Sequence, residues 1–348
     1  MSIIKKNSFA NVYFSAQLPD VEFSISGSRA NVVVSVDSTV IYDEVLVPLN
    51  GGIAITDLAG MVEPWVEQVL VANLTVDIKE LDNSGNQTAS EKMLTQVLFS
   101  RAYINASAEE FYRGYFLSTL IGTKITAMKR LEYLHYYGTD AATVTAHYDD
   151  GSSQTFPGVA VAGNSRYTTL DVSPQRFAKS GRTLCSYTVS VGSRQQSYII
   201  DQDNPDCAPV LLFTNSFGVQ ELLYCTGTHE VDPKYTRSNA FFSGKYNNYD
   251  IEELRTFKAD TGIMNTAMAN WADDLFRSRE IYIVNFYNGN PQVGMEIAIT
   301  DSNSKNDNND ETLPRFSFDY RYAQRNHNVI DIKRAGRIFD NTFDNTFN

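Results

Sequence analysis

Apolar and polar residues alternate with a period of two along most of this chain, and this pattern constrains it to fold mainly as β-strands. Clear examples are Val32-Val34-Val36, Leu74-Val76-Ile78 and Tyr187-Val189-Val191. Successive side chains of a strand point to opposite faces of a sheet, so the pattern predicts strands with one buried and one solvated face. We expect a mostly β protein made of tandem β-sandwich-like domains with a few short helices.

The chain has 348 residues, which suits two or three domains of about 100 to 150 residues each. Its hydrophobic content of 43% is enough for real cores. We expect an N-terminal β-sandwich-like domain over residues 1–106 and a second β domain over residues 107–205. A third β-rich domain over residues 206–330 should carry one helix near residues 265–277, and residues 331–348 should form a C-terminal tail.

Two segments break the β pattern and indicate helices. Asn265 should cap a helix over Thr266–Phe276. Its expected inward stripe is Met268, Trp271, Ala272 and Leu275. A shorter helix should start at the cap Thr56 and end near Glu63, because Pro64 follows and a proline interrupts a helix interior.

Turn residues predict how the strands pair. Thr143–Tyr148 and Ser153–Phe156 flank Asp149-Asp150-Gly151, which is typical of a β-hairpin. The two adjacent aspartates suit such a turn, so we interpret them as structural and not as a catalytic pair. Farther on, Val293–Ile299 should pair with Phe316–Tyr322.

The net charge of -12 and the pI near 4.8 argue against a basic surface for DNA or an anionic membrane. We therefore expect no specific nucleic-acid binding. No apolar stretch reaches the roughly 18 residues that a membrane span needs. The segment Met1–Asn11 has Lys5 and Lys6 but no apolar run behind them, so we expect no secretory signal and synthesis in the cytoplasm.

The sequence offers little support for a catalytic or metal site. The cysteines and histidines have no zinc-site spacing: Cys185, Cys207, Cys225, His135, His147, His229 and His327. Asp301–Glu311 resembles a calcium loop, but Lys305 and Asn306 stand where an oxygen ligand and a glycine are needed. Nucleophile elbows, phosphate-binding loops and dinucleotide fingerprints are absent from the sequence. We predict a protein that is not an enzyme and that binds no cofactor or metal.

The chain ends in the polar repeat FDNTFDNTFN, with Phe339, Phe343 and Phe347 in phase. A segment this polar cannot bury enough surface to fold alone. We expect these phenylalanines, with Arg334 and Arg337 before them, to contact a neighbouring subunit. The alternative is a frayed chain end without a role.

Basic and aromatic residues are frequent over the last part of the chain. They are Arg315, Tyr320, Arg321, Tyr322, Arg325, Lys333, Arg334 and Arg337. Stacking on nucleic acid is one interpretation. A docking face for an acidic copy of the same chain is the more economical one.

The string Phe213-Thr214-Asn215-Ser216-Phe217-Gly218-Val219-Gln220-Glu221 resembles a motif of virion tail proteins from phages and prophages of gut Bacteroides-type bacteria. In that family an aromatic residue precedes N-x-[FY]-G, which is followed by x-x-E and an apolar strand. The helix around Trp271, the strand Ile281–Val284, the segment Ile53–Leu58 and the phenylalanine tail are also similar to that family. The resemblance implies a structural building block and supplies no catalytic residues.

We therefore expect a non-enzymatic phage virion structural protein, a repeated subunit of the tail, the tail tip or baseplate, or a connector ring. Its expected partners are copies of itself in a ring and other virion tail proteins. One alternative is a glycan-binding β-sandwich protein of a gut bacterium. Another is a tail-associated polysaccharide-cleaving enzyme, because two catalytic carboxylates can come from distant strands.

Overall fold

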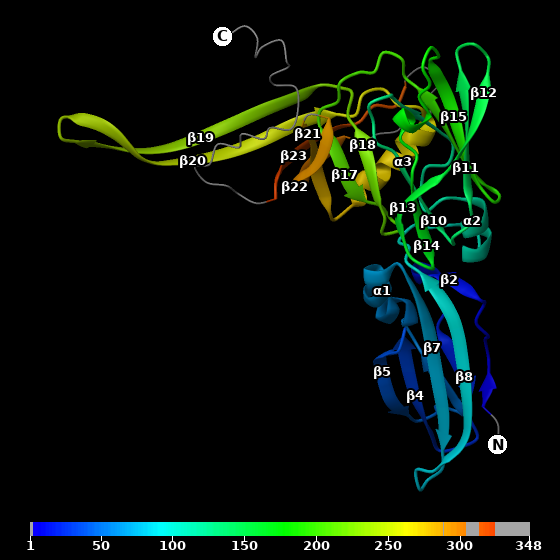
Figure 1. Ribbon diagram of the computed structural model, residues 1–348. Helices are drawn as coiled ribbons and strands as arrows, with labels where there is room; N and C mark the ends of the chain where they lie inside the picture. The colour runs from blue at the N-terminus through cyan, green and yellow to red at the C-terminus, as the bar shows by residue number, and fades with distance from the viewer. Residues whose placement is uncertain (1–2, 288, 304–312, 324–348) are drawn as a thin grey trace.

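The computed structural model describes residues 3–287, 289–303 and 313–323 (Figure 1). Strands dominate every part of it. A β-sandwich formed by the first part of the chain lies at one end of the molecule, two further β-rich parts lie at the other end, and a long hairpin projects from them. This confirms the expected mostly β fold of tandem β-sandwich-like domains with a few short helices.

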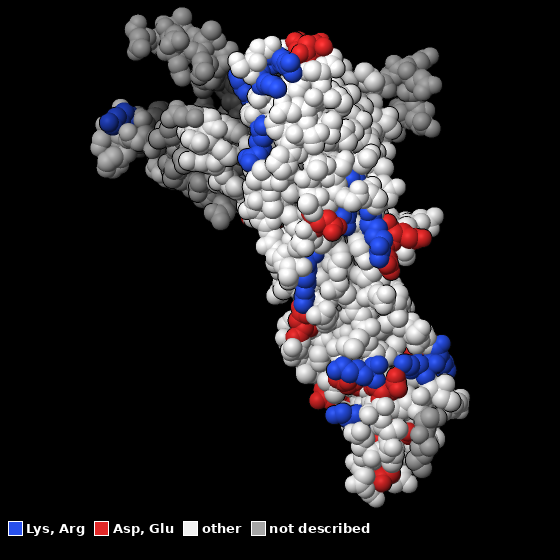
Figure 2. All heavy atoms as spheres, turned by 45° about the vertical axis from the view of Figure 1, so that its right-hand side comes forward, with Lys and Arg blue, Asp and Glu red and all other residues white. Residues whose placement is uncertain are grey.

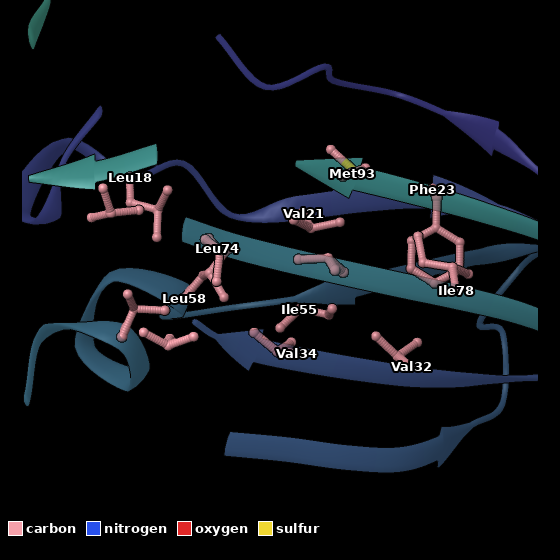
Figure 3. Packing of buried hydrophobic residues seen from close by; sticks show 14 of the residues in the cluster. Leu18, Val21, Phe23, Val32, Val34, Ile55, Leu58, Leu74, Ile78 and Met93 are labelled. Carbon is pink, nitrogen blue, oxygen red and sulfur yellow. The ribbon is translucent and has the colours of Figure 1, made fainter. Parts of the chain in front are cut away.

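The first domain consists of two facing sheets, with strand orders β2-β8-β7-β4-β5 and β1-β3-β6. Its elements are β1 (Ile4–Lys5), β2 (Val12–Phe14), the 3₁₀ helix η1 (Ser15–Gln17), β3 (Val21–Ser24), β4 (Arg29–Val36), β5 (Thr39–Leu46), β6 (Gly52–Ile55), α1 (Leu58–Val69), β7 (Val71–Leu81) and β8 (Gln87–Leu98). Alternate residues of β4 are buried, as its period of two predicts. Figure 3 shows Val32, Val34, Leu74 and Ile78 of the larger sheet lying among Val21, Phe23 and Ile55 of the facing sheet.

Helix α1 differs from the expectation in two respects. Its cap is Asp57 and not Thr56, with the Asp57 carboxylate accepting a hydrogen bond from the backbone N–H of Gly60 at 3.3 Å. The helix also continues through Pro64. Proline in a helix costs about 3 kcal/mol. Burial of Leu58, Val62 and Val66 offsets this cost, because each buried aliphatic side chain contributes about 1.5 to 3 kcal/mol.

The second domain again has two sheets, with strand orders β12-β11-β15-β16-β9 and β10-β14-β13. Its elements are α2 (Ala108–Gly114), β9 (Thr123–Thr126), β10 (Tyr133–Tyr137), β11 (Ala142–Tyr148), β12 (Ser153–Pro157), β13 (Val159–Gly163), β14 (Tyr167–Asp171), the 3₁₀ helix η2 (Pro174–Phe177), β15 (Leu184–Val191) and β16 (Arg194–Ile200). Strands β11 and β12 form the predicted hairpin. Asp149 and Asp150 accept backbone hydrogen bonds from Thr183 and Ser152, which confirms their structural role.

The third domain contains one seven-stranded sheet with the order β18-β17-β21-β22-β23-β20-β19. Its elements are β17 (Val210–Thr214), β18 (Gln220–Tyr224), β19 (His229–Phe242), β20 (Lys245–Asp260), α3 (Thr266–Arg277), β21 (Ile281–Tyr287), β22 (Asn290–Asn303) and β23 (Ser317–Tyr322). Helix α3 has the predicted cap, with Asn265 Oδ1 accepting from the N–H of Met268 at 2.8 Å. The predicted pairing of β22 with β23 is also confirmed.

Separate hydrophobic clusters fill the three domains, and a fourth cluster joins them. In that fourth cluster Phe14 of the first domain contacts Phe111 and Phe217, with ring centroids 5.6 and 5.8 Å apart. The domains are therefore packed on one another at this point. Division of the chain into units at residues 106, 205 and 330 stays a prediction.

Candidate interaction site

Strands β19 and β20 form a long hairpin that we call the arm (residues 229–260). The two strands pair from His229↔Ala259 at the base to Phe242↔Lys245 at the tip. Only Phe257–Asp260 of the arm also pairs with β23. Figure 1 shows that the rest of the arm projects away from the body. The sequence pattern predicted no strand over residues 229–260, so the arm is a large feature that the sequence did not indicate.

The base of the arm is fixed in the third-domain core. The rings of His229, Phe257 and Tyr320 are stacked on one another, and His229 Nε2 lies 2.9 Å from the Tyr320 hydroxyl. Burial lowers the pKa of His229 below its ordinary value. Arg315 Nε lies 2.7 Å from the carboxylate of Asp260. The arm thus leaves the body from an anchored base.

The far end of the arm, residues 237–249, which we call the arm tip, exposes four aromatic side chains. Phe241, Phe242, Tyr246 and Tyr249 are 64%, 72%, 75% and 73% exposed. The connecting turn has two consecutive positive φ angles, which suits a two-residue hairpin loop. Phe241 and Tyr246 face each other across the two strands, with centroids 5.1 Å apart. Exposed aromatics gathered at the end of a projecting element are typical of a protein contact.

The arm tip differs in charge from the rest of the molecule. Arg237 and Lys245 give residues 237–249 a net charge of +2, and the acidic Asp250 lies directly opposite Ser238 at the inner end of the tip. The whole chain carries -12, and the remainder therefore carries -12 minus +2, which is -14. Figure 2 shows a face of the body on which basic and acidic side chains lie in small mixed groups between wide uncharged areas. The arm tip is thus a basic, aromatic element on an acidic protein.

The motif that carries the family resemblance forms a tight turn, Asn215–Gly218, which we call the junction turn. Asn215 Oδ1 accepts hydrogen bonds from the backbone N–H groups of Phe217 at 2.9 Å and Val219 at 3.2 Å. Gly218 has φ +76°, and a Cβ there would lie 2.6 Å from the side chain of Leu70, which follows α1. The asparagine and the glycine therefore shape the turn and let the first domain pack against it.

The junction turn connects all three domains. Ser216 of the third domain accepts a hydrogen bond from the backbone N–H of Arg101, at 2.7 Å, next to the first domain. The amide of Asn215 donates to the backbone carbonyl of Leu117 at 2.9 Å. The side chains of Asn215, Ser216 and Glu221 have structural partners, and Gly218, Val219 and Gln220 line an adjacent groove. The resemblance therefore falls on an architectural element.

The glutamate of the motif is the centre of a buried polar network. Glu221 accepts hydrogen bonds from Ser118 Oγ at 2.7 Å, Asn215 Nδ2 at 2.8 Å and Trp271 Nε1 at 3.0 Å. Burial raises the pKa of Glu221, and the charge of Lys124 and these three donors oppose the rise. Because its oxygens are occupied by structural donors, Glu221 holds the second and third domains together.

A second buried pair lies beside this network. Lys124 Nζ contacts Glu132 at 2.7 Å, and both side chains are less than 9% exposed. Glu132 also accepts a hydrogen bond from Thr126 Oγ1 at 2.7 Å. The Lys124 ammonium lies 4.4 Å from the centroid of the Trp271 ring. Both glutamates are thus held in structural contacts.

A groove opens where the three domains meet, and we call it the junction groove. It has a volume of about 500 Å³. Its walls are mainly apolar, and prominent members are Leu131, Tyr133, Val161, Leu212, Leu222 and Val293. His135 also lines it, with Nε2 donating to the carbonyl of Gln220 at 2.9 Å and Nδ1 accepting from the hydroxyl of Thr169 at 2.9 Å. Burial lowers the pKa of His135 to about 4, so every side chain that lines the groove is uncharged at neutral pH.

The predicted site residues have different outcomes. Phe339, Phe343, Phe347, Arg334 and Arg337 lie outside the described residues, and their role stays a prediction. The predicted basic-aromatic patch is wrong as a single surface. Tyr320 is fully buried in the third-domain core, where the alternation of β23 places it, and Arg315 pairs with Asp260.

The candidate metal ligands do not gather in the described part of the chain. Within residues 3–287, 289–303 and 313–323, no group of three or more His, Cys, Asp or Glu side chains could hold a metal ion. Most of the calcium-like loop falls outside these ranges. The three cysteines are free thiols, and burial raises the pKa of Cys225. Across the same described residues no helix has the length and apolar character to span a membrane.

Trp271, which a glycan-binding protein would need on its surface, is 1% exposed. Its ring packs against Phe213, with centroids 5.8 Å apart, and its indole N–H is bonded to Glu221. Sugar-stacking aromatics must be accessible, so this residue supports the core interpretation.

No family model matches the chain, and neither does any curated protein. Among solved structures, a crystal structure of Rst D1-D2 is 8% identical and covers 58% of this chain and 99% of that one, with a TM-score of 0.26. The titin I-band fragment I67-I69 is 10% identical and covers 75% and 93% of the two chains, with a TM-score of 0.19. These TM-scores are too low to establish a structural relationship with either protein.

Proposed function

We propose that this chain is a non-enzymatic structural protein of a phage virion. It would act as a repeated subunit of the tail, the tail tip or baseplate, or a connector ring. Its partners would be copies of itself and other tail proteins, and its location would be the virion after synthesis in the host cytoplasm.

The projecting arm is the observation that carries this proposal. A two-stranded hairpin is marginally stable in water, and exposed aromatics on free strand edges favour association. A monomeric protein gains nothing from such an element, whereas a subunit of an assembly uses it to reach a neighbour. The basic tip on an acidic chain supports a neighbour of the same kind.

Two further features support a structural role. The resemblance to virion tail proteins falls on the junction turn, whose residues hold the three domains together. The buried carboxylates Glu221 and Glu132 are bonded to structural donors and not aimed at a substrate cavity.

Particles from the phage or prophage that encodes the chain provide the test. Mass spectrometry of purified virions should find the chain in several copies per particle, and antibody labelling in electron micrographs should mark the tail. Absence from intact particles, with the chain present in the host cell, would overturn the proposal. Retention of the purified chain on host glycans without any association with particles would favour the glycan-binding alternative.

A further inference from the structure

We propose that the arm tip of one copy docks in the junction groove of a second copy. This inference rests on the proposed function, because it requires that the chain assembles with itself. It adds which surface is inserted and which surface receives it.

The described part of the three domains does not cover the arm tip. Figure 1 shows that the arm points away from the three domains. Outside its base, neither strand of the arm pairs with any other described strand. Phe242 and Tyr246 are more than 70% exposed as a result. No described residue outside the arm covers these rings, and we infer that a second copy of the chain does so.

The second argument is the size of the surface that would be buried. A fully buried aromatic side chain removes about 150 to 250 Å² from water. The four aromatics of the arm tip are 64% to 75% exposed, so they offer about 400 to 700 Å². A stable interface buries about 800 Å² on each partner, so these rings supply a large part of one and the backbone of the hairpin must supply the rest.

The third argument is charge. The arm tip carries +2 and the remainder of the chain carries -14. A second copy therefore attracts the arm tip, whereas two arm tips repel each other. This favours docking of the arm on the body of a neighbour over pairing of arm with arm.

The fourth argument concerns the receiving surface. The junction groove, at about 500 Å³, lies within the range of about 300 to 1,000 Å³ over which proteins bury apolar ligands. Its uncharged lining suits phenylalanine rings. Strand β13 forms one wall and pairs only with β14 among the described strands, so its outer edge is open. Val161 on this strand is 51% exposed. A hairpin can thus add to the edge of β13 and place aromatic side chains in the groove beside it.

Strand β5 in the first domain provides a matched alternative. It is also an edge strand, and Val45 on it is 51% exposed, the same fraction as Val161. No residue of β5 lines the junction groove. If any open edge sufficed, the arm would bind β5 as readily as β13.

Disulfide trapping distinguishes the two edges. In a Cys185→Ser background, Phe242→Cys protein is mixed with Val161→Cys protein and oxidised, and with Val45→Cys protein as the control. All three introduced cysteines replace exposed residues. Non-reducing gels should show a covalent dimer for Phe242→Cys with Val161→Cys, and at most a trace for Phe242→Cys with Val45→Cys. Equal trapping at Val45, or no trapping at Val161 in an assembled sample, would overturn the proposed docking.

Self-association of the variants separates the two proposals. The double variant Phe241→Ser and Tyr246→Ser should weaken association at least about ten-fold in sedimentation equilibrium, since anchors of this kind dominate interfaces. If the wild-type chain associates and this variant associates equally well, the docking inference fails and the proposed virion role stands. If the wild-type chain is found in virions but purified protein never associates, the inference fails as well.

Discussion

Trp271 donates its indole N–H to the carboxylate of Glu221 at 3.0 Å, and this bond joins helix α3 to edge strand β18. The helical stripe predicted an inward Trp271, whereas the sequence marked Glu221 only as the last residue of the string Phe213–Glu221. The structure brings them together at the contact between the second and third domains, where Ser118 donates to the same carboxylate. Trp271 and Glu221 thus hold the second and third domains in contact.

The first prediction concerns this contact. Trp271→Ala should lower the free energy of unfolding by about 3 to 5 kcal/mol, because it leaves a cavity and removes one of the three donors to the buried Glu221 carboxylate. Trp65→Ala is the control, since Trp65 is 42% exposed and its loss should cost less than about 1 kcal/mol. Urea denaturation measures both. A Trp271→Ala protein as stable as the control would contradict the core position of this ring.

The second prediction concerns pH. The pKa of His135 is lowered from 6.5 to about 4 by burial. Between these values the unfolded state binds more protons, so stability falls as the pH drops from 6.5 toward 4. The loss from this one group approaches about 3 kcal/mol. His135→Gln should flatten the dependence of the urea midpoint on pH over this range, whereas His147→Gln, at an exposed position, should leave it unchanged. Equal slopes for all three proteins would show that His135 does not titrate in this way.

The third prediction concerns the buried ion pair. Lys124→Met should destabilise the protein by about 3 to 5 kcal/mol, because Glu132 is left charged and buried. The double variant Lys124→Met and Glu132→Gln should recover part of the loss. Lys92→Met, which breaks an exposed pair with Asp77, should cost at most about 1 kcal/mol. If the double variant is less stable than Lys124→Met alone, uncompensated charge is not the cause.

The fourth prediction concerns the C-terminal repeat. Three buried phenylalanines contribute about 5 to 9 kcal/mol. Ordering ten residues costs on the order of 10 kcal/mol, so backbone pairing and the basic residues before the repeat must add to them. Deletion of residues 339–348 should leave a soluble, folded chain that fails to enter particles. Normal incorporation of the truncated chain in purified virions would refute a docking role for Phe339, Phe343 and Phe347.

The sequence predicted the elements whose two faces differ. Alternation located β4 and β7, turn residues located the β11–β12 hairpin, and the stripe around Trp271 located α3. The arm was missed because most of it covers no core: Val231 and Tyr235 alternate with polar residues, but from Thr236 to Asn239 every residue is polar. Pro233 also argued against a strand, although an edge strand tolerates it. The turn Ser243-Gly244 between aromatic residues was the available signal.

The contacts between domains could not be predicted from one sequence. Ser118 and Glu221 are 103 residues apart, and no local pattern connects them. The junction groove likewise combines Leu70, at the end of α1, with β13, β18 and β22. Long-range contacts of this kind depend on how complete sheets pack, which the periodicity of single strands does not specify.

The molecular mass of the purified chain in solution, compared with that of an arm-shortened variant, tests the central claim most directly. Thr236 pairs with Glu252, so replacing residues 237–251 by Asn-Gly closes the shortened hairpin with a two-residue turn. Light scattering should find a multi-subunit assembly for the full chain and a folded monomer with an unchanged unfolding midpoint for the variant. A full chain that stays monomeric at every concentration, or a variant that assembles like the full chain, would contradict assembly through the arm.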